Sequence, residues 1–244
     1  MSEVIWHDIE CGRYEEDLPL WNRLAAEAQV GGQAVLDVGA GTGRVTLALA
    51  RAGHRVVALD RSSELLQALG QRAQGLPVET VCADARDFHL PGRSFPLIVV
   101  PMQTIQLLGG PEGHLSFLRC ARRHLAGGGL LAIAVAAAED FEEFEWHDGD
   151  PAPLPDIAEL DGSAYFSQPT AVRRIGDAFI LERRREVVDA SGVRTSAADR
   201  IALDVVTVEE LQVAAAQCGL RPLGVRTIGA TDEHIGSEVV IFGG

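Results

Sequence analysis

The sequence predicts an α/β fold built on a doubly wound parallel sheet, and three observations carry this prediction. Short runs that are apolar on both faces alternate with amphipathic runs through the first half of the chain. This alternation is typical of parallel strands covered by helices. A glycine-rich turn joins the first strand-like run to the helix-like run after it. Acidic residues end the second and third runs, at the edge where open α/β sheets bind ligands.

The elements of the first half are expected to repeat a strand–helix unit. Residues 1–30 are expected to form a helical lid segment before the first strand. The strands are expected at residues 35–38, 55–59, 78–82, 97–100 and 130–135, and the helices at residues 45–51, 65–72 and 115–125.

The pattern changes after about residue 138, where acidic and aromatic residues and then three prolines interrupt the alternation. Strand-like runs follow at residues 164–173, 178–188 and 194–206, with a turn signal before the last. These runs predict an antiparallel β layer, inserted over residues 140–206 into an otherwise single domain that spans residues 1–244.

The last part of the chain returns to the main sheet. Thr207 and Glu210 form a capping-box pattern that begins a helix, and Gly219 ends it. Strand-like runs at residues 225–228 and 238–242 are expected to form a terminal antiparallel hairpin.

Composition narrows the classes of function. The 244 residues are 47% hydrophobic, enough for one substantial core. The formal net charge of −14 argues against nucleic-acid binding, which usually needs a basic face. The basic residues are all arginine, so no lysine is available as a base. The four cysteines form no CxxC pair, and no apolar run is long enough to cross a bilayer. We therefore expect a reduced, cytoplasmic protein with no metal site and no membrane partner.

The glycine loop separates two kinds of cofactor. Its spacing is Gly39-x-Gly41-x-Gly43, whereas a dinucleotide-binding loop would place its third glycine where this chain has Arg44. A strand, a glycine-rich turn and a helix together suit an anionic or nucleotide ligand, because the backbone is accessible and the helix N-terminus favours negative charge. Asp60 ends the second strand, where an acid can bond ribose hydroxyls.

The stretches VLDVGAGTGR and CADARDF, with Asp60 between them, resemble the class I S-adenosylmethionine-dependent methyltransferases. SFPLIVVPMQTIQLL and ARRHLAGGGLLAIAV are similar to that family's fourth and fifth strands, so the resemblance covers residues 14–135. It implies a Rossmann-like seven-stranded sheet and S-adenosylmethionine as cofactor. The chain departs from the family at Pro96, often an aspartate, and at residues 126–129, often a Pro-Gly-Gly turn.

The resemblance also implies which residues hold the cofactor. Asp37 would hold the loop and the amino group of the methionine moiety, Asp60 the ribose hydroxyls, and Asp84 the adenine amino group. Tyr14 matches an aromatic residue that often closes over the cofactor. A local structural role stays open for the glycines, Asp60, Asp84 and Tyr14. The full expected set is Tyr14, Asp37, Gly39, Ala40, Gly41, Gly43, Asp60, Arg61, Asp84, Ala85, Pro101 and Met102.

The expected acceptor is a small molecule. Enzymes that act on exocyclic base amines share an Asn/Asp-Pro-Pro-aromatic sequence after the fourth strand, and this chain has VVPMQ there. The inserted β layer is similar to that of small-molecule N-methyltransferases, including those acting on amino sugars. N-methylation is slightly favoured over O-methylation, and C-methylation stays open. The residues expected to contact the acceptor are Trp6, Gln103, Gln106, Phe144 and Trp146.

A general base matters if the acceptor arrives protonated. An amine with a pKa of about 10.4 needs about 4–5 kcal/mol to free its lone pair at neutral pH. His7 and His147 are the candidate bases, with a local hydrogen-bonding role as the alternative for each.

Two charged groups extend this hypothesis. Acidic residues after the fifth strand are interpreted either as steering cationic acceptors or as a solvated loop, and residues 183–185 either as a phosphate site or as a solvent-facing strand. The acids are Glu142, Glu143, Glu145 and Asp148.

Three functions are weighed. The leading one is S-adenosylmethionine-dependent methyl transfer to a small molecule by in-line displacement. The second is a non-catalytic S-adenosylmethionine-binding sensor or partner subunit. The third, a nicotinamide-dependent oxidoreductase, is disfavoured by Arg44, Asp37 and Asp84. A homodimer supported by the inserted β layer is also left open.

Overall fold

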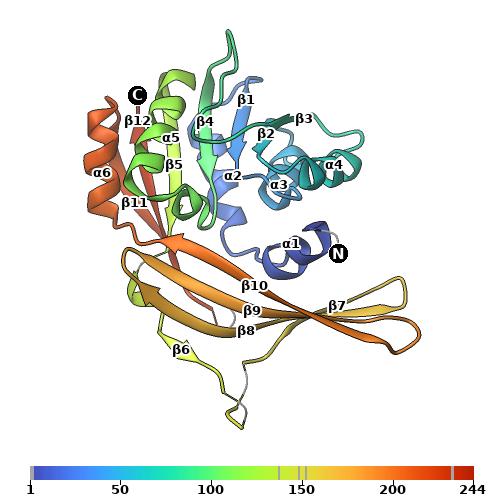
Figure 1. Cartoon of the computed structure of the whole chain (residues 1–244). Helices are drawn as coiled ribbons and strands as arrows, with labels where there is room; N and C mark the ends of the chain where they lie inside the picture. Colours follow the sequence, from blue (N-terminus) through green and yellow to red (C-terminus); the bar gives the residue numbers. More distant parts are fainter. Residues whose placement is uncertain (1–2, 137, 148, 152, 232–233) are drawn as a thin grey trace.

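The computed structural model describes residues 3–136, 138–147, 149–151, 153–231 and 234–244. Within these residues, sheet A has seven strands in the order β11-β12-β5-β4-β1-β2-β3. Sheet B has strands β10-β9-β8-β6 in order, with β7 paired to β8. Sheet B lies across one edge of sheet A, and α1 (Glu3–Cys11) lies between the two sheets (Figure 1). The predicted fold class, a parallel sheet with a terminal hairpin and an inserted antiparallel layer, is confirmed.

The centre of sheet A is parallel. β1 pairs with β2 on one side and with β4 on the other, which creates a topological switch point between β1 and β4. Ligands of open α/β sheets bind outside the carboxyl ends of the strands at such a point. The parallel strands are β1 (Ala34–Val38), β2 (Arg55–Asp60), β3 (Val78–Cys82), β4 (Phe95–Val100) and β5 (Leu125–Val135).

Helices cover both faces of sheet A because they bury apolar stripes against its strands. One face packs against α2 and α3, with Trp21 and Leu24 completely buried. The other packs against α5 and α6, with Phe117 completely buried. None of the helices in the described residues is long and apolar enough to span a bilayer. The helices are α2 (Leu18–Glu27), α3 (Arg44–Arg51), α4 (Ser63–Arg72), α5 (Gly110–His124) and α6 (Val208–Gln217).

The terminal hairpin completes sheet A. β11 (Arg221–Ile228) pairs antiparallel with β12 (Ser237–Gly243), and β12 pairs antiparallel with β5. α6 begins at the predicted capping box, where Thr207 accepts from the Glu210 backbone and the Glu210 side chain accepts from the Thr207 backbone. Because β12 is antiparallel to both β11 and β5, β11 runs in the same direction as β5. Its carboxyl end therefore lies at the same edge of sheet A as the carboxyl ends of the parallel strands.

Sheet B extends further than the sequence indicates. β8, β9 and β10 match the three predicted runs, but two strands precede them. These two were missed because β6 has two residues and β7, DIAEL, mixes polar and apolar residues after a proline-rich stretch. The strands are β6 (Phe144–Glu145), β7 (Asp156–Leu160), β8 (Ser163–Ile175), β9 (Ala178–Val188) and β10 (Arg194–Asp204).

Gln106 ties together the two chain crossings between the sheets. It lies in η1 (Thr104–Leu107) and is 1% exposed. Its amide oxygen accepts from Ala136 N at 3.0 Å, where the chain leaves β5. Its amide nitrogen donates to Asp204 O at 3.1 Å, where the chain returns from β10. The Asp204 carboxylate accepts from Gly109 N and Gly110 N, which fastens the same crossing to the start of α5.

A buried ion pair ties the N-terminal segment to α3. Asp17 is 1% exposed and accepts hydrogen bonds from both terminal nitrogens of Arg44 and, at 2.8 Å, from Trp21 Nε1. Arg44 is the first residue of α3, directly after the glycine loop. The pair therefore fixes the lid segment against the loop.

We expect Asp17→Ala to destabilise the protein by about 3–5 kcal/mol, because it leaves the Arg44 guanidinium buried without its counter-ion. Urea unfolding followed by circular dichroism measures this loss. Glu16→Ala, at the adjacent exposed position, is the control and should change stability by less than about 0.5 kcal/mol. A loss below about 1 kcal/mol for Asp17→Ala would contradict the structural role given to the pair.

Gln106→Ala should destabilise by about 2–4 kcal/mol, because Ala136 N and Asp204 O lose their partners in a buried site. The same unfolding experiment checks it, with Gln103→Ala on the same loop as the matched control. If the two variants unfolded at the same urea concentration, the link between the crossings would carry no stability.

Candidate functional site at the carboxyl edge of sheet A

The glycine loop follows β1 and is packed closely on both sides. Gly39, Gly41 and Gly43 have φ angles of +76°, +54° and +101°, which side chains rarely adopt. A Cβ on Gly39 would overlap the Thr104 side chain, and a Cβ on Gly41 would overlap the His7 imidazole. The loop backbone therefore packs directly against η1 and α1 (Glu3–Cys11), and a side chain at Gly39 or Gly41 would not fit.

Asp60 joins the glycine loop to the start of α4. One carboxylate oxygen accepts from Gly41 N at 2.9 Å and the other from Ser62 N at 2.9 Å. A carboxylate has about four lone-pair sites, so both oxygens keep capacity for hydroxyl donors. The structure thus shows the structural role left open above, and the expected ribose contact stays a prediction. Ala40 is buried in the same loop, and its N donates to Leu59 O at 3.1 Å.

Asp37 has one carboxylate oxygen without a partner. Its other oxygen accepts from Thr46 Oγ1 at 2.6 Å, which links β1 to the first turn of α3. Oδ1 is buried and has no hydrogen-bond partner in the part of the chain that the structure describes. Burial raises the pKa of Asp37 to about 6, against the lowering effect of the Thr46 hydrogen bond. A buried acceptor without a donor is unfavourable, so this oxygen fits a cationic group of a ligand.

The residues after β3 are more exposed. Asp84 forms a two-nitrogen ion pair with Arg86, at 3.0 Å and 2.6 Å, and this hydrogen bonding lowers the pKa of Asp84 to about 2. Ala85 is half-buried between them, and Arg61, after β2, is exposed. Asp84 is therefore charged and paired locally, and its expected contact with adenine stays a prediction.

Met102 marks the switch point between β1 and β4. It follows Pro101 at the end of β4. Its φ of +52° is a left-handed conformation that is unfavourable for residues other than glycine or asparagine. Such strain is found most often at ligand sites. Gln103, also half-buried, follows it at this edge.

Tyr14 lies between the glycine-loop helix and the terminal hairpin. The Arg44 guanidinium lies 5.1 Å from the centre of its ring and donates to its backbone oxygen at 2.8 Å. The centre of the His234 ring lies 4.9 Å from that of Tyr14. The phenol is buried and has no hydrogen-bond partner among the described residues, and burial raises the pKa of Tyr14 to about 12.

α1 contacts the loop on one side and sheet B on the other. His7 Nδ1 lies 3.2 Å from Thr42 Oγ1, and burial lowers the pKa of His7. Trp6 is 4% exposed and packs edge-on against Tyr165 at 5.7 Å, with Arg185 over its ring at 5.4 Å. The His7 side chain of α1 thus contacts the glycine loop. Trp6 packs between the N-terminal segment and sheet B.

Two expected positions need correction. Gln106 was expected to contact the acceptor, but its amide is buried and both of its polar atoms bond backbone groups. His147 was expected as a base, but its side chain is 68% exposed and 3.6 Å from Asp150. It follows β6, which lies at the end of sheet B remote from α1 (Figure 1). An imidazole there does not face the glycine loop.

The neighbours of His147 share its remote position. Phe144 pairs with Val172 on β8, and the Trp146 ring lies 5.1 Å from the Arg184 guanidinium. The structure therefore brings neither Phe144 nor Trp146 to the glycine loop.

Two acids of the predicted steering group are used locally. Glu145 pairs with Arg173 on β8, and Glu143 accepts from Arg174 N at 3.1 Å. Glu142 is exposed, and Asp148 lies outside the described residues. These contacts are those of a loop packed on its own sheet, so steering stays a hypothesis.

The basic run of β9 is divided between two faces of sheet B. Arg185 bonds Glu10 of α1 at 2.8 Å and 2.7 Å and Asp199 at 2.8 Å. Arg183 alternates to the same face, and Arg184 to the other. The side chains of Arg183 and Arg185 are 16% and 21% exposed. The interpretation of a solvent-facing strand is therefore wrong for these two residues.

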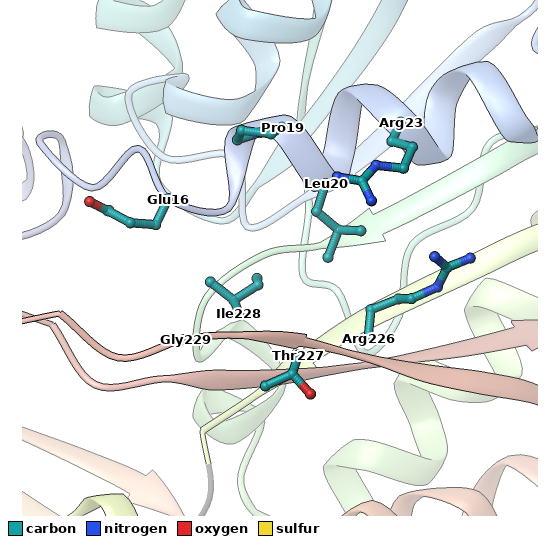
Figure 2. A pocket seen from close by; sticks show the side chains of 8 residues that line it. All are labelled: Glu16, Pro19, Leu20, Arg23, Arg226, Thr227, Ile228 and Gly229. Carbon is teal, nitrogen blue, oxygen red and sulfur yellow. The ribbon is translucent and has the colours of Figure 1, made fainter.

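A hollow lies between α2 and the carboxyl end of β11 (Figure 2). Leu20 and Ile228 lie between Glu16 at one end and Arg23 and Arg226 at the other. Arg226 is 3.5 Å from Glu27. Its lining residues are Glu16, Pro19, Leu20, Arg23, Arg226, Thr227, Ile228 and Gly229. The hollow is separate from the glycine loop, and sequence reasoning did not find it.

Sequence reasoning also missed His234, whose ring lies 4.9 Å from that of Tyr14, and Asp156, which lies 3.5 Å from Arg183. No local pattern marks them, because one precedes the last strand and the other begins a strand with mixed polarity. Their contacts are with residues far away in the sequence.

Residues 35–129 match a family model described as a methyltransferase domain. The chain is 33% identical over 119 residues to a cypemycin N-terminal methyltransferase from Streptomyces sp, which covers 49% of this chain and 48% of that protein. It is 41% identical over 109 residues to a demethylmenaquinone methyltransferase from Clavibacter sepedonicus, which covers 44% of this chain and 43% of that protein. The chain thus spans about half the length of the curated relatives it matches.

The fold is similar to that of solved methyltransferases over nearly the whole chain. The sugar N-methyltransferase KedS8 from Streptoalloteichus sp ATCC 53650 superposes with a TM-score of 0.78 and 22% identity, covering 99% of this chain and 92% of that one. The S-adenosylmethionine-bound amino pentose methyltransferase CalS10 from Micromonospora echinaspora gives 0.73 and 23%, covering 97% and 96%. Residues 35–129 thus match a methyltransferase-domain model, and the chain has the Rossmann-like fold of these solved methyltransferases.

Proposed function

We propose that this protein transfers a methyl group from S-adenosylmethionine to a small polar acceptor, with nitrogen as the favoured acceptor atom. The observation that carries the proposal is the buried, unpartnered oxygen of Asp37 beside a glycine loop that admits no side chain. When bound, the cofactor supplies an electrophilic methyl group on a sulfonium. The protein supplies alignment and exclusion of water.

The residues present fit this cofactor. Asp37 would bond the amino group of its methionine part, and the free lone pairs of Asp60 would take the ribose hydroxyls. Both acids lie at the carboxyl edge of sheet A, on adjacent strands beside the switch point. The glycine turn lets a ligand approach the backbone ahead of α3.

Two observations support an amine as acceptor. The net charge of −14 favours cations in the surrounding solution and disfavours nucleic acids. The relatives include an N-terminal methyltransferase of cypemycin and a sugar N-methyltransferase. A cytoplasmic location and a homodimer are further parts of the proposal.

The alternative is a protein that binds S-adenosylmethionine without turnover, as a sensor or partner subunit. The same loop would serve it, so cofactor binding alone does not distinguish the two. Transfer of a radiolabelled methyl group to a panel of amino sugars, amino acids and short peptides does. Labelled product supports the enzyme, and binding without any product supports the alternative.

Calorimetry should show binding of S-adenosylmethionine and S-adenosylhomocysteine and no binding of NADH. Asp60→Ala should weaken the affinity for both compounds by about 10- to 100-fold, because it removes the carboxylate that would accept hydrogen bonds from the ribose hydroxyls. Asp60→Asn tests whether the carboxylate charge or only the loop contact matters. Asp161→Ala, in an exposed turn, is the control. A folded protein that binds neither compound would contradict the proposed function.

Asp37→Asn should stabilise the protein while weakening its binding of the cofactor. Because the pKa of Asp37 is about 6 in the folded chain and lower in the unfolded chain, its ionisation destabilises the fold as pH rises from about 4 to about 6. The variant lacks this effect and should be more stable by up to about 3 kcal/mol at pH 7, with no gain at pH 4. Urea unfolding at both pH values measures this, with Asp161→Asn as the control. An equal gain at pH 4 would contradict ionisation as the cause.

A further inference from the structure

We propose that the acceptor amine binds at a group of four side chains, called the chamber below, that consists of Tyr14, Asp156, Arg183 and His234, with His234 as its general base. This inference rests on the proposed function and locates the acceptor side of the same site. Tyr14 follows α1, Asp156 begins β7, Arg183 lies on β9 and His234 precedes β12.

The chamber adjoins the glycine loop through Tyr14. The Tyr14 backbone oxygen is bonded by Arg44, the residue after Gly43, and its ring faces both Arg44 at 5.1 Å and His234 at 4.9 Å. The Tyr14 ring thus contacts both the first residue of α3 and an imidazole. Because β11 runs in the same direction as β5, the hairpin turn carries His234 to the carboxyl edge where the cofactor would lie.

Two buried polar atoms in the chamber have no partner within the described residues. They are the Tyr14 hydroxyl and Arg183 Nε. Among the described residues, Arg183 forms an ion pair with Asp156 alone, at 3.5 Å. Its neighbour Arg185, by contrast, has shorter bonds to both Glu10 and Asp199. Buried polar groups in native proteins are nearly always satisfied, so a polar ligand or water belongs beside these two atoms.

Asp156 supplies a negative charge to the chamber. The residue after it, Ile157, accepts at its backbone oxygen from the side chain of Arg13, the neighbour of Tyr14, at 2.6 Å. Burial raises the pKa of Asp156, and the nearby Arg183 opposes this rise. Arg183 lies no closer than 3.5 Å to the Asp156 carboxylate, and the Asp156 side chain is 48% exposed. Its carboxylate therefore keeps lone pairs for an ammonium group.

Two hydrogen bonds to Thr231 hold the backbone of His234. Its backbone oxygen accepts from Thr231 N at 2.8 Å, and its backbone N donates to Thr231 Oγ1 at 3.0 Å. These bonds fix the backbone and leave the imidazole facing Tyr14. Its ring is half-buried, and the phenol beside it is buried.

Several other histidines are already used or remote. His7 lies on the glycine loop beside Thr42. His114 lies 3.2 Å from Asp204, and both ring nitrogens of His124 have backbone partners. His147 is exposed at the remote end of sheet B. The ring of His234, by contrast, lies against the Tyr14 ring of the N-terminal segment.

These groups select a primary or secondary amine with a hydroxyl or carbonyl oxygen nearby. Asp156 attracts the ammonium, and Arg183 Nε donates to the neighbouring oxygen. The ammonium passes one proton to His234, and the freed lone pair forms the N–C bond to the methyl group. The C–S bond breaks with its electron pair going to sulfur, and any second proton leaves with the product. Atoms and charge balance, with a neutral thioether as the leaving group.

The first test uses sinefungin, a cofactor analogue in which a carbon bearing an amine replaces the methylated sulfur. Calorimetry compares sinefungin with S-adenosylhomocysteine, which lacks that amine. We expect Asp156→Asn and Tyr14→Phe to weaken sinefungin by about 10-fold or more and S-adenosylhomocysteine by less than about 2-fold. Glu159→Gln, an exposed acid on the same strand, should change neither.

The outcomes separate the inference from the proposed function. If the wild-type protein binds neither compound, the proposed function fails. If both bind but the ratio of their affinities is the same in Asp156→Asn and Glu159→Gln, the chamber is not the acceptor site and the inference fails. Equal weakening of both compounds would also overturn it, since that would mean a general loss of fold.

The second test measures the base, with glucosamine and other amines that accept the labelled methyl group. His234→Gln should lower kcat by about 100-fold or more and leave the affinity for S-adenosylhomocysteine unchanged. It should also remove the fall in kcat/KM at acid pH that protonation of the base causes. His89→Gln, at an exposed site, is the control. An unchanged pH profile in His234→Gln, or its loss in His147→Gln, would overturn the role of His234.

Discussion

The ion pair between Asp17 and Arg44 is the interaction on which the carboxyl edge of this protein depends. Both side chains are buried, and together they join the N-terminal segment to the first residue of the cofactor helix. A charge buried without its partner is strongly unfavourable, so this contact fixes position more than it adds stability. Tyr14 follows from it, because Arg44 also bonds the Tyr14 backbone and covers its ring.

α1 extends this constraint to both sides of the site. On the loop side, Asp8 accepts from Thr42 Oγ1 at 2.7 Å and pairs with Arg72 of α4. On the side of sheet B, Glu10 is 6% exposed and bonds Arg185. One short helix therefore contacts the structure that would hold the cofactor and the sheet that would hold the acceptor.

The parallel core and its glycine loop could be predicted because their signals are local. An apolar strand, a turn that needs positive φ and an acid at the next strand end are visible in the residues 35–60 alone. The role of Gln106 could not be predicted, because its partners Ala136 and Asp204 are distant in sequence and meet only once sheet B has folded back. The remote position of His147 has the same origin. A histidine in an acidic stretch looks accessible in sequence, and only the pairing of β6 with β8 shows where it lies.

The chemistry of the proposed chamber favours nitrogen over oxygen as the methyl acceptor. An imidazole with a pKa of about 6.5 can take a proton from an ammonium of about 10.4 at a cost of about 5 kcal/mol, within reach of a positioned catalyst. A hydroxyl group as weakly acidic as water has a far higher pKa than an ammonium and would cost more than twice that. In the proposed site Asp156 would add to this preference, since a carboxylate stabilises an ammonium but opposes an alkoxide. Deprotonation of an amine is therefore the step that these particular residues can assist.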